Sequence, residues 1–369
     1  MWYESGPRLG SAMLFTAAAL AGTLALAGNE PEISGIAIAT YQSADTSGLS
    51  GTAPRDEANA ALDIGVSVPA GGGAVELQIK GGTTPRRDGV TSALAEANAA
   101  AGVTLDENER GRVVLWQAFY RHDVGNGSLA AGLIDPAAWL DGNDIANNEF
   151  TQFLGAGLVN NLTIDFPSAS VGAAYTAGLG KGWSLAALLT SATGVEPDYR
   201  RAFEPYHHGH GGFAALELQW SGGGIGTNVG VWINSRRHDS DGDGIDDERL
   251  GPGAARGIYA NVSGGLGRGH WNLRLGWADP RVQADTGFAA VAVAYPVGNS
   301  LLGVGATHSL ASDHLSGPHR DRSQFEIYLR TPVAKAWTIT PDLQYVVHTG
   351  FDPAHTGTWV AGVRVGRSF

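Results

Sequence analysis

Short segments in which apolar and polar residues alternate recur along this chain from residue 34 to Phe369. They are joined in turn by a brief glycine turn and by a longer polar loop. A strand that alternates in this way has one apolar and one polar face. Regular alternation of short and long joints places the turns at one end of the strands and the loops at the other. The pattern predicts an up-and-down β-barrel with two unlike rims.

Sixteen segments fit the strand pattern, and an even number with both chain ends on one rim is typical of an outer-membrane barrel. The sequence therefore predicts an all-β fold: a transmembrane up-and-down antiparallel β-barrel of about 16 strands, with short periplasmic turns and long extracellular loops. The longer joints are expected at 43–57, 81–110, 135–166, 191–209 and 235–253. The strands are expected to start near Ser34, Ala58, Ala74, Gly111, Gly127, Ser168, Gly182, His210, Gly226, Ala254, Gly269, Thr286, Ser300, Ser323, Ala336 and Thr356.

The N-terminal segment 1–27 is expected to be a secretory signal peptide. Its apolar run follows Arg8 and ends in the small-residue site Ala25-Leu26-Ala27, and a retained helical anchor is the alternative. Residues 28–369 then form one barrel domain, because no Pro- or Ser-rich linker interrupts the strand pattern. The chain has no cysteine, which excludes disulfides, thiolate metal sites and thiol catalysis. Its net charge of -12 argues against a nucleic-acid partner.

The two faces of the strands predict which side chains meet lipid. In the segment 75–80, valine, leucine and isoleucine alternate with glutamate, glutamine and lysine. Trp337 and Tyr345 lie near opposite ends of one apolar face, as expected for aromatic belts at two membrane interfaces. The apolar set is therefore expected to face lipid and the polar set the lumen. A barrel of sixteen strands is too wide for side chains to fill, so the lumen is water-filled or plugged by a loop.

The polar set and one loop supply the candidate pore-lining residues. Because both signs of charge occur among them, neutral polar cargo is expected. Two tryptophans have two possible roles each. Trp139 contacts sugar or anchors its loop. Trp232 lines the lumen, or faces lipid if the register is shifted by one residue. The candidates are Glu76, Lys80, Gln117, Arg121, Trp139, Trp232, Arg274, Glu326, Arg330, Asp342, Gln344 and Arg364, with Asp63, Glu217, Asn228 and Asn261 on the same faces.

The segment 111–166 resembles the carbohydrate-selective porins of the OprB family, and a second similarity covers 339–348 and the closing strand 362–369. The resemblance implies a barrel channel for sugar diffusion. The loop 135–167 is expected to fold inward as a constriction, because it is long and rich in aromatic and acidic residues. The matching residues of the first segment are Gly132, Asp135, Pro136, Asn147, Glu149, Thr151, Gln152, Phe153, Leu154, Asn160 and Asn161.

The loop 235–253 is acidic and expected to be extracellular. Asp239, Asp241 and Asp243 occupy alternate positions before a glycine, a spacing that can wrap oxygen ligands around Ca²⁺. Asp246 or Asp247 would complete the shell, and a solvated loop without metal is the alternative. No other cofactor is expected.

The leading functional prediction is a porin of the Gram-negative outer membrane. It would let small hydrophilic solutes, sugars in particular, diffuse passively through its water-filled barrel. The protein would lie among outer-membrane lipid and lipopolysaccharide, as a monomer or a homo-oligomer. A surface barrel whose calcium-binding loop acts in attachment or envelope structure is the alternative. An enzyme is not expected, since no nucleophile elbow or spaced triad occurs in the sequence.

Overall fold

The computed structural model describes residues 30–45, 56–102, 104–196, 198–203, 211–236, 250 and 253–369. The expected signal peptide, residues 1–27, lies outside the described residues. So do the five candidate calcium ligands Asp239, Asp241, Asp243, Asp246 and Asp247. Both expectations stay predictions.

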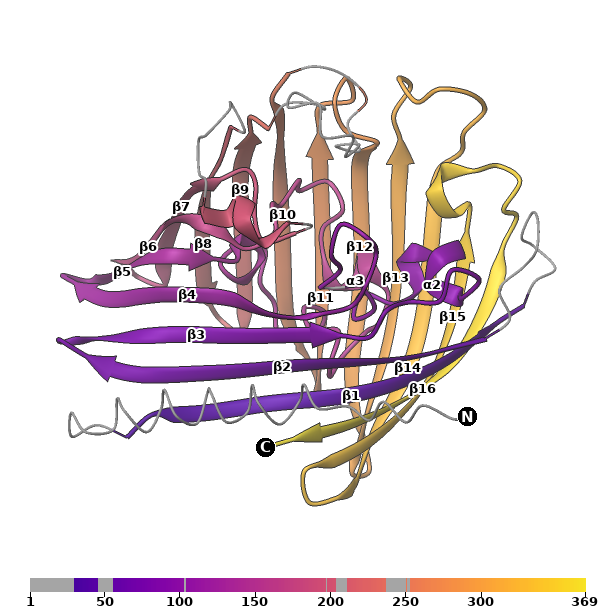
Figure 1. The fold of residues 1–369 in the computed structure, drawn as a ribbon, viewed down its shortest axis with the longest axis horizontal. Helices are drawn as coiled ribbons and strands as arrows, with labels where there is room; N and C mark the ends of the chain where they lie inside the picture. Colours follow the sequence, from indigo (N-terminus) through magenta and orange to yellow (C-terminus); the bar gives the residue numbers. More distant parts are fainter. Residues whose placement is uncertain are drawn as a thin grey trace, which may run out of the picture.

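Sixteen antiparallel strands form one closed barrel in which each strand pairs with its neighbours in sequence and β16 pairs with β1 (Figure 1). The predicted fold class is confirmed, and every strand begins within two residues of its predicted start. The strands are β1 (Glu32–Ala44), β2 (Asp56–Ala70), β3 (Gly73–Gly82), β4 (Val113–Val124), β5 (Gly127–Ile134), β6 (Ser170–Gly180), β7 (Trp183–Ser191), β8 (Gly212–Gly222), β9 (Ile225–Asn234), β10 (Ala255–Leu266), β11 (Gly269–Ala278), β12 (Asp285–Val297), β13 (Ser300–Ala311), β14 (Arg322–Ala334), β15 (Trp337–Val347) and β16 (Thr358–Ser368).

The outer surface carries the apolar face of the strands. Leu216, Val231 and Ile258 are about half exposed on it, although large aliphatic side chains are normally buried. Trp277 and Trp337 are also exposed there. An apolar exterior of this kind requires lipid rather than water around the barrel.

The joints after even-numbered strands are tight turns. Between β2 and β3, Gly71 and Gly72 have φ angles of 55° and 83°, in the left-handed region that glycine adopts without steric cost. Most joints after odd-numbered strands are longer, as the sequence predicts.

Two of the longer joints lie inside the barrel (Figure 1). The joint between β3 and β4, residues 83–112, carries α2 (Val90–Ala93) and the 3-10 helix η2 (Ala95–Ala97). The joint between β5 and β6, residues 135–169, carries η3 (Pro136–Ala138) and α3 (Ala156–Val159). The sequence predicts an inward fold only for the second. Two further 3-10 helices, η4 (Tyr199–Phe203) and η6 (Thr349–Phe351), lie in other long joints.

Strand β4 departs from strict alternation. Gln78 of β3 pairs with Gln117, and the next residue, Ile79, pairs with Leu115, so Trp116 is the extra residue of a β-bulge. Trp116 and Gln117 are consecutive and both buried. The bulge therefore turns two neighbouring side chains toward the lumen, where a regular strand would present one.

Inward glycines make room for aromatic rings of the adjacent strand. The Tyr328 ring of β14 lies against Gly303 of β13, and Tyr259 of β10 lies against Gly230 of β9, so closely that a Cβ atom on either glycine would collide with the ring. Both tyrosines are almost fully buried. These contacts replace the side-chain packing that glycine alone cannot provide.

Apolar packing fills the part of the lumen beside β8 to β10. Leu140 and Ile164 of the joint 135–169 form one buried cluster with Phe213, Trp232 and Tyr259 on the inner wall of β8 to β10. Open space is consequently left on the side of β2 to β4.

Candidate solute passage

A cavity of about 800 Å³ lies between the inner wall of β2 to β4 and the joint 135–169; we call it the passage. Glu149 and Asn160 of that joint line its other side, and Glu196 of the joint between β7 and β8 also reaches it. From the wall it is lined by Asp63, Gln78, Lys80, Trp116, Gln117 and Asp135.

A chain of hydrogen bonds runs along the strand side of the passage. Gln78 Nε2 donates to both carboxylate oxygens of Asp63, at 2.9 and 2.8 Å. Gln117 Nε2 donates to Gln78 Oε1 at 2.6 Å, and Gln117 Oε1 accepts from the Asp135 backbone N–H at 3.0 Å. Each amide thus has a fixed orientation, which gives the wall defined donors and acceptors for a polar solute.

Lys80, Trp116 and Asp135 form a compact unit in the same wall. Lys80 Nζ lies 4.9 Å from the centre of the Trp116 ring and 3.9 Å from Asp135 Oδ2. The indole Nε1–H donates to the same carboxylate oxygen at 2.6 Å. The unit combines an aromatic surface, an ammonium group and a carboxylate at one level of the passage.

The wall continues toward the short turns with a second ion pair. Arg121 Nη2 lies 3.1 Å from Glu76 Oε1, and the two side chains are partly exposed. A smaller cavity of about 340 Å³ lies beside them and includes Ser67, Gly73 and Asp123 in its lining. Polar groups therefore line β3 and β4 from Asp135 to the turn at the far rim.

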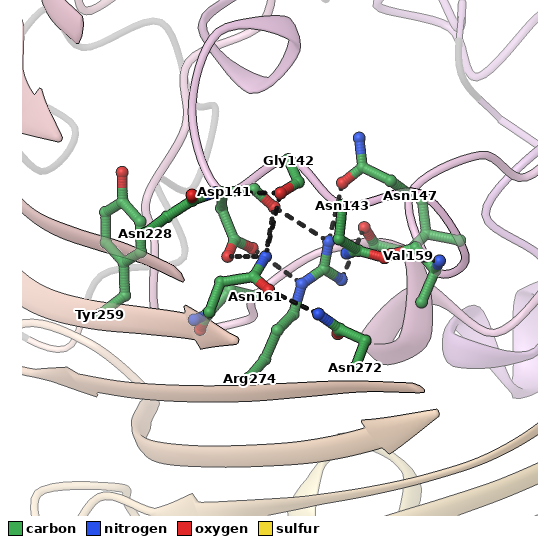
Figure 2. A network of polar contacts seen from close by, with 12 residues as sticks. Asp141, Gly142, Asn143, Asn147, Val159, Asn161, Asn228, Tyr259, Asn272 and Arg274 are labelled. Carbon is green, nitrogen blue, oxygen red and sulfur yellow. Dashed lines mark hydrogen bonds and ion pairs between the residues drawn. The ribbon is translucent and has the colours of Figure 1, made fainter. Parts of the chain in front are cut away.

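The opposite wall is occupied by anchors for the joint 135–169 (Figure 2). Arg274 Nε lies 3.1 Å from Asp141 Oδ2, and both side chains are nearly fully buried. The Arg274 guanidinium also donates to the carbonyls of Leu158 and Val159, at 3.1 and 3.0 Å. Glu217 accepts from the Asp141 backbone N–H at 2.7 Å.

Asp141 has a left-handed backbone, with a φ angle of 55°, which an aspartate adopts more readily than most residues. Burial raises the pKa of its carboxyl to about 6, although Arg274 and Asn261 favour the charged form. Asn261 Nδ2 donates to Asp141 Oδ1 at 3.1 Å. Buried partners on the barrel wall thus hold the loop at Asp141.

Two arginines and a glutamate hold the next part of the same joint. Arg364 donates to the carbonyls of Glu149 and Gln152, both at 2.6 Å, and Arg330 donates to the carbonyl of Thr151 at 2.9 Å. Glu326 accepts from the backbone N–H groups of Leu154 and Gly155, both at 2.7 Å. Cationic groups therefore bind loop carbonyls, and a carboxylate binds loop N–H groups.

The joint 83–112 is anchored in a similar way. Gln344 Nε2 donates to the Ala97 carbonyl and to Asp342 Oδ1, both at 2.9 Å. Glu96 lies 2.7 Å from the Arg322 guanidinium. Burial alone would raise the pKa of Glu96, but Arg322 and hydrogen bonds from residues 349 and 350 outweigh it and hold that pKa below its usual value.

The two tryptophans singled out from the sequence pack in or against the apolar cluster of the lumen. The Trp139 ring makes an edge contact with Phe119, with centroids 5.9 Å apart, so its position matches the loop-anchoring interpretation. Trp232 is 3% exposed and stacks on Phe213, which places it inside the barrel, as the unshifted register predicts. Neither ring lines the passage.

The candidate residues therefore divide into three groups. Lys80 and Gln117 line the passage, and Glu76 and Arg121 form the ion pair beside the smaller cavity nearer the short turns. Arg274, Glu326, Arg330, Asp342, Gln344 and Arg364 are on inward faces as predicted, but they contact the two inner joints or one another. The two tryptophans form the third group.

Sequence reasoning missed Trp116 as a lining residue because strict alternation turns it to lipid. The bulge turns Trp116 inward instead. Its only sign in the sequence is that a large residue, Trp116, and a polar residue, Gln117, are adjacent. Glu96 was missed because its partner Arg322 is more than two hundred positions away in the chain.

The closed sixteen-strand barrel, its apolar exterior and its loop-narrowed lumen define an outer-membrane porin. Residues 73–369 match the sequence model of the carbohydrate-selective porin, OprB family. The chain belongs to this family.

Solved structures support the same fold. OprB of Pseudomonas putida superposes with a TM-score of 0.72 at 12% identity, over 94% of this chain and 96% of that one. A mutant porin of Rhodopseudomonas blastica superposes with a TM-score of 0.52 at 13% identity, over 92% of this chain and all of that one. An uncharacterized protein of Aquifex aeolicus is 34% identical over 94 residues, and the match spans only 30% of that protein's length.

Proposed function

We propose that this porin lets small sugars diffuse passively across the outer membrane through the passage. The observation that carries the proposal is the unit of Lys80, Trp116 and Asp135 in the passage wall. A sugar has apolar faces and a hydroxylated rim, so an aromatic surface beside charged hydrogen-bond partners suits it. Weak contacts at several levels permit both entry and release, as diffusion requires.

Planar-bilayer recording tests this function. The purified protein should conduct ions, and adding a neutral hexose should lower the current while the sugar occupies the passage. Trp116→Ala should weaken the block, because the aromatic surface is lost. Trp359→Ala is a matched control, since this tryptophan is half exposed on the outer surface. Absence of conductance would rule out the porin function, and a block by sugar that is unaffected in Trp116→Ala would rule out the role of this unit.

The calcium site proposed for Asp239, Asp241, Asp243, Asp246 and Asp247 rests on the spacing of the residues alone. Weak affinity would suffice for a loop that faces millimolar calcium. Isothermal titration with Ca²⁺ should show uptake that Asp241→Asn abolishes. Heats equal to buffer dilution at millimolar Ca²⁺ would rule the site out, and with it the alternative function in attachment.

A further inference from the structure

Three inward-facing arginines of the lumen do not face the passage. Arg274, Arg330 and Arg364 direct their guanidinium groups to the carbonyls of the joint 135–169. Glu217 and Glu326 in turn accept N–H groups of that joint. Charged groups of both signs thus hold the loop. The presence of both signs on the inward faces of the strands therefore does not give the charge of the passage.

The groups that do line the passage are unevenly charged. Lys80 interacts there with four carboxylates: Asp135, Glu149, Asp63 and Glu196. Asp135 is the only one of the four within 4 Å of its Nζ atom among the described ion pairs. The passage is therefore lined by more negative than positive groups.

Arg322, at the edge of the passage, does not correct this imbalance. It lies 2.7 Å from Asp285 and 2.7 Å from Glu96, so two carboxylates face one guanidinium. This trio also has more negative than positive groups.

Glu196 is a carboxyl of the passage whose charged form is incompletely compensated. Its Oε1 atom is buried and has no hydrogen-bond partner among the described residues. Burial raises the pKa of this carboxyl to about 8, although Arg112 and Lys80 favour the charged form. Burial likewise raises the pKa of Glu149 despite the attraction of Lys80. A cation entering the passage would supply the missing compensation.

We propose that the passage is cation-selective, so that among small polar solutes it favours amino sugars over neutral sugars and neutral sugars over sugar acids. This inference rests on the proposed porin function. A narrow channel with low-dielectric walls and an excess of one charge concentrates ions of the other sign. The ammonium group of an amino sugar can approach the same carboxylates as Lys80, whereas a sugar carboxylate is repelled by them.

Reversal potentials under a KCl gradient test the selectivity. The wild-type protein should pass K⁺ in preference to Cl⁻. Asp63→Asn and Glu149→Gln should each lower the permeability ratio, by about fivefold for a charge that lies about 4 Å from the ion in water. Glu196→Gln should lower it by a similar factor in buffers above pH 8, where this carboxyl is negative. Lys80→Gln should raise the ratio. Asp135 is left unchanged, because it also holds Trp116 and Gln117.

Asp88→Asn is the control, because this carboxylate is highly exposed, pairs with Arg86 and does not line the passage. Its reversal potential should equal that of the wild type. A conducting protein that prefers Cl⁻, or whose selectivity is unchanged in all four passage variants, would overturn this inference and leave the porin function standing. A protein that never conducts would overturn both.

Liposome swelling extends the test to solutes. A hexosamine should enter faster than a neutral hexose, and a hexuronate should be slowest. The triple variant Asp63→Asn, Glu149→Gln, Glu196→Gln should lose this order, and its ion conductance in planar bilayers shows that its barrel is folded and open. Fastest entry of the hexuronate into wild-type liposomes would contradict the proposal.

Discussion

Arg274 is 1% exposed and lies inside a membrane barrel, so its charge depends on its partners for stability. Asp141 supplies the opposite charge, and carbonyls of the joint 135–169 accept from the remaining N–H groups. Removing one partner of such a pair leaves the other charge buried without compensation. Arg274 thus links the wall of β11 to the loop that bounds the passage.

Arg274→Met is expected to lower the free energy of unfolding by about 3–5 kcal/mol, the usual effect of breaking a buried ion pair. Denaturant unfolding in detergent micelles measures it. Arg121→Met is the matched control, because its pair with Glu76 is partly exposed and should contribute about 0–1 kcal/mol. Equal losses in the two variants would show that Arg274 is not a principal anchor.

Glu196 makes the selectivity of the passage dependent on pH. Its pKa is raised to about 8, so the carboxyl is largely neutral below that pH and negative above it. The groups that act on it are Arg112, Lys80 and Asp135, with a backbone hydrogen bond from Leu105. Raising the pH through about 8 should increase the preference for K⁺ over Cl⁻. Reversal potentials in Glu196→Gln should lack this step, and an identical step in the variant would assign it to another group.

Adjacent strands fit together where an inward glycine meets an aromatic ring. A Cβ atom at Gly303 would collide with the Tyr328 ring, and the ring also makes an edge contact with Phe153, with centroids 4.9 Å apart. The contact therefore couples the seam between β13 and β14 to the joint 135–169. A larger residue has no space to occupy without moving one of them.

Gly303→Ala should accordingly destabilise the barrel by about 1–3 kcal/mol, the range for overpacking a filled site. The temperature at which the folded protein loses its compact electrophoretic mobility measures the loss. Gly226→Ala serves as the comparison, since a Cβ atom there would meet nothing within 4 Å. Its effect should stay within about 0.5 kcal/mol. A wild-type transition in Gly303→Ala would mean that the ring can move aside.

At the scale of the whole molecule, the two inner joints divide the lumen. The apolar cluster that includes Leu140 and Phe213 closes one side, and the passage remains on the other. A link between the joints, from the Ala99 N–H to the Leu154 carbonyl at 2.7 Å, makes them one insert. The barrel supplies the membrane surface, and the insert decides the size of the channel.

The volume of the passage, about 800 Å³, lies within the range of about 300–1,000 Å³ of pockets that enclose small molecules. Swelling rates of liposomes should therefore fall steeply from a monosaccharide to a trisaccharide of the same sugar. Similar rates for the monosaccharide and the trisaccharide would indicate a passage wider than this structure has.

The barrel itself could be predicted from the sequence, because strand alternation and the alternation of joints are local patterns. Residues 75–80 show which face meets lipid, and glycine pairs such as Gly71 and Gly72 mark the turns. The strands pair in sequence order, so little long-range information was needed to obtain the topology. The resemblance of residues 111–166 to the OprB family supplied the class of channel.

The passage could not be predicted from the sequence alone. From the sequence, three arginines on inward faces were expected to offset the carboxylates that line the lumen. Only the tertiary structure shows that these arginines bind the carbonyls of a distant loop. Trp116 turns inward through a bulge, which local alternation does not encode. The sequence by itself determined the barrel, because period-two patterning acts within each strand. The tertiary structure decided the channel, because its walls are set by contacts between residues far apart in the chain.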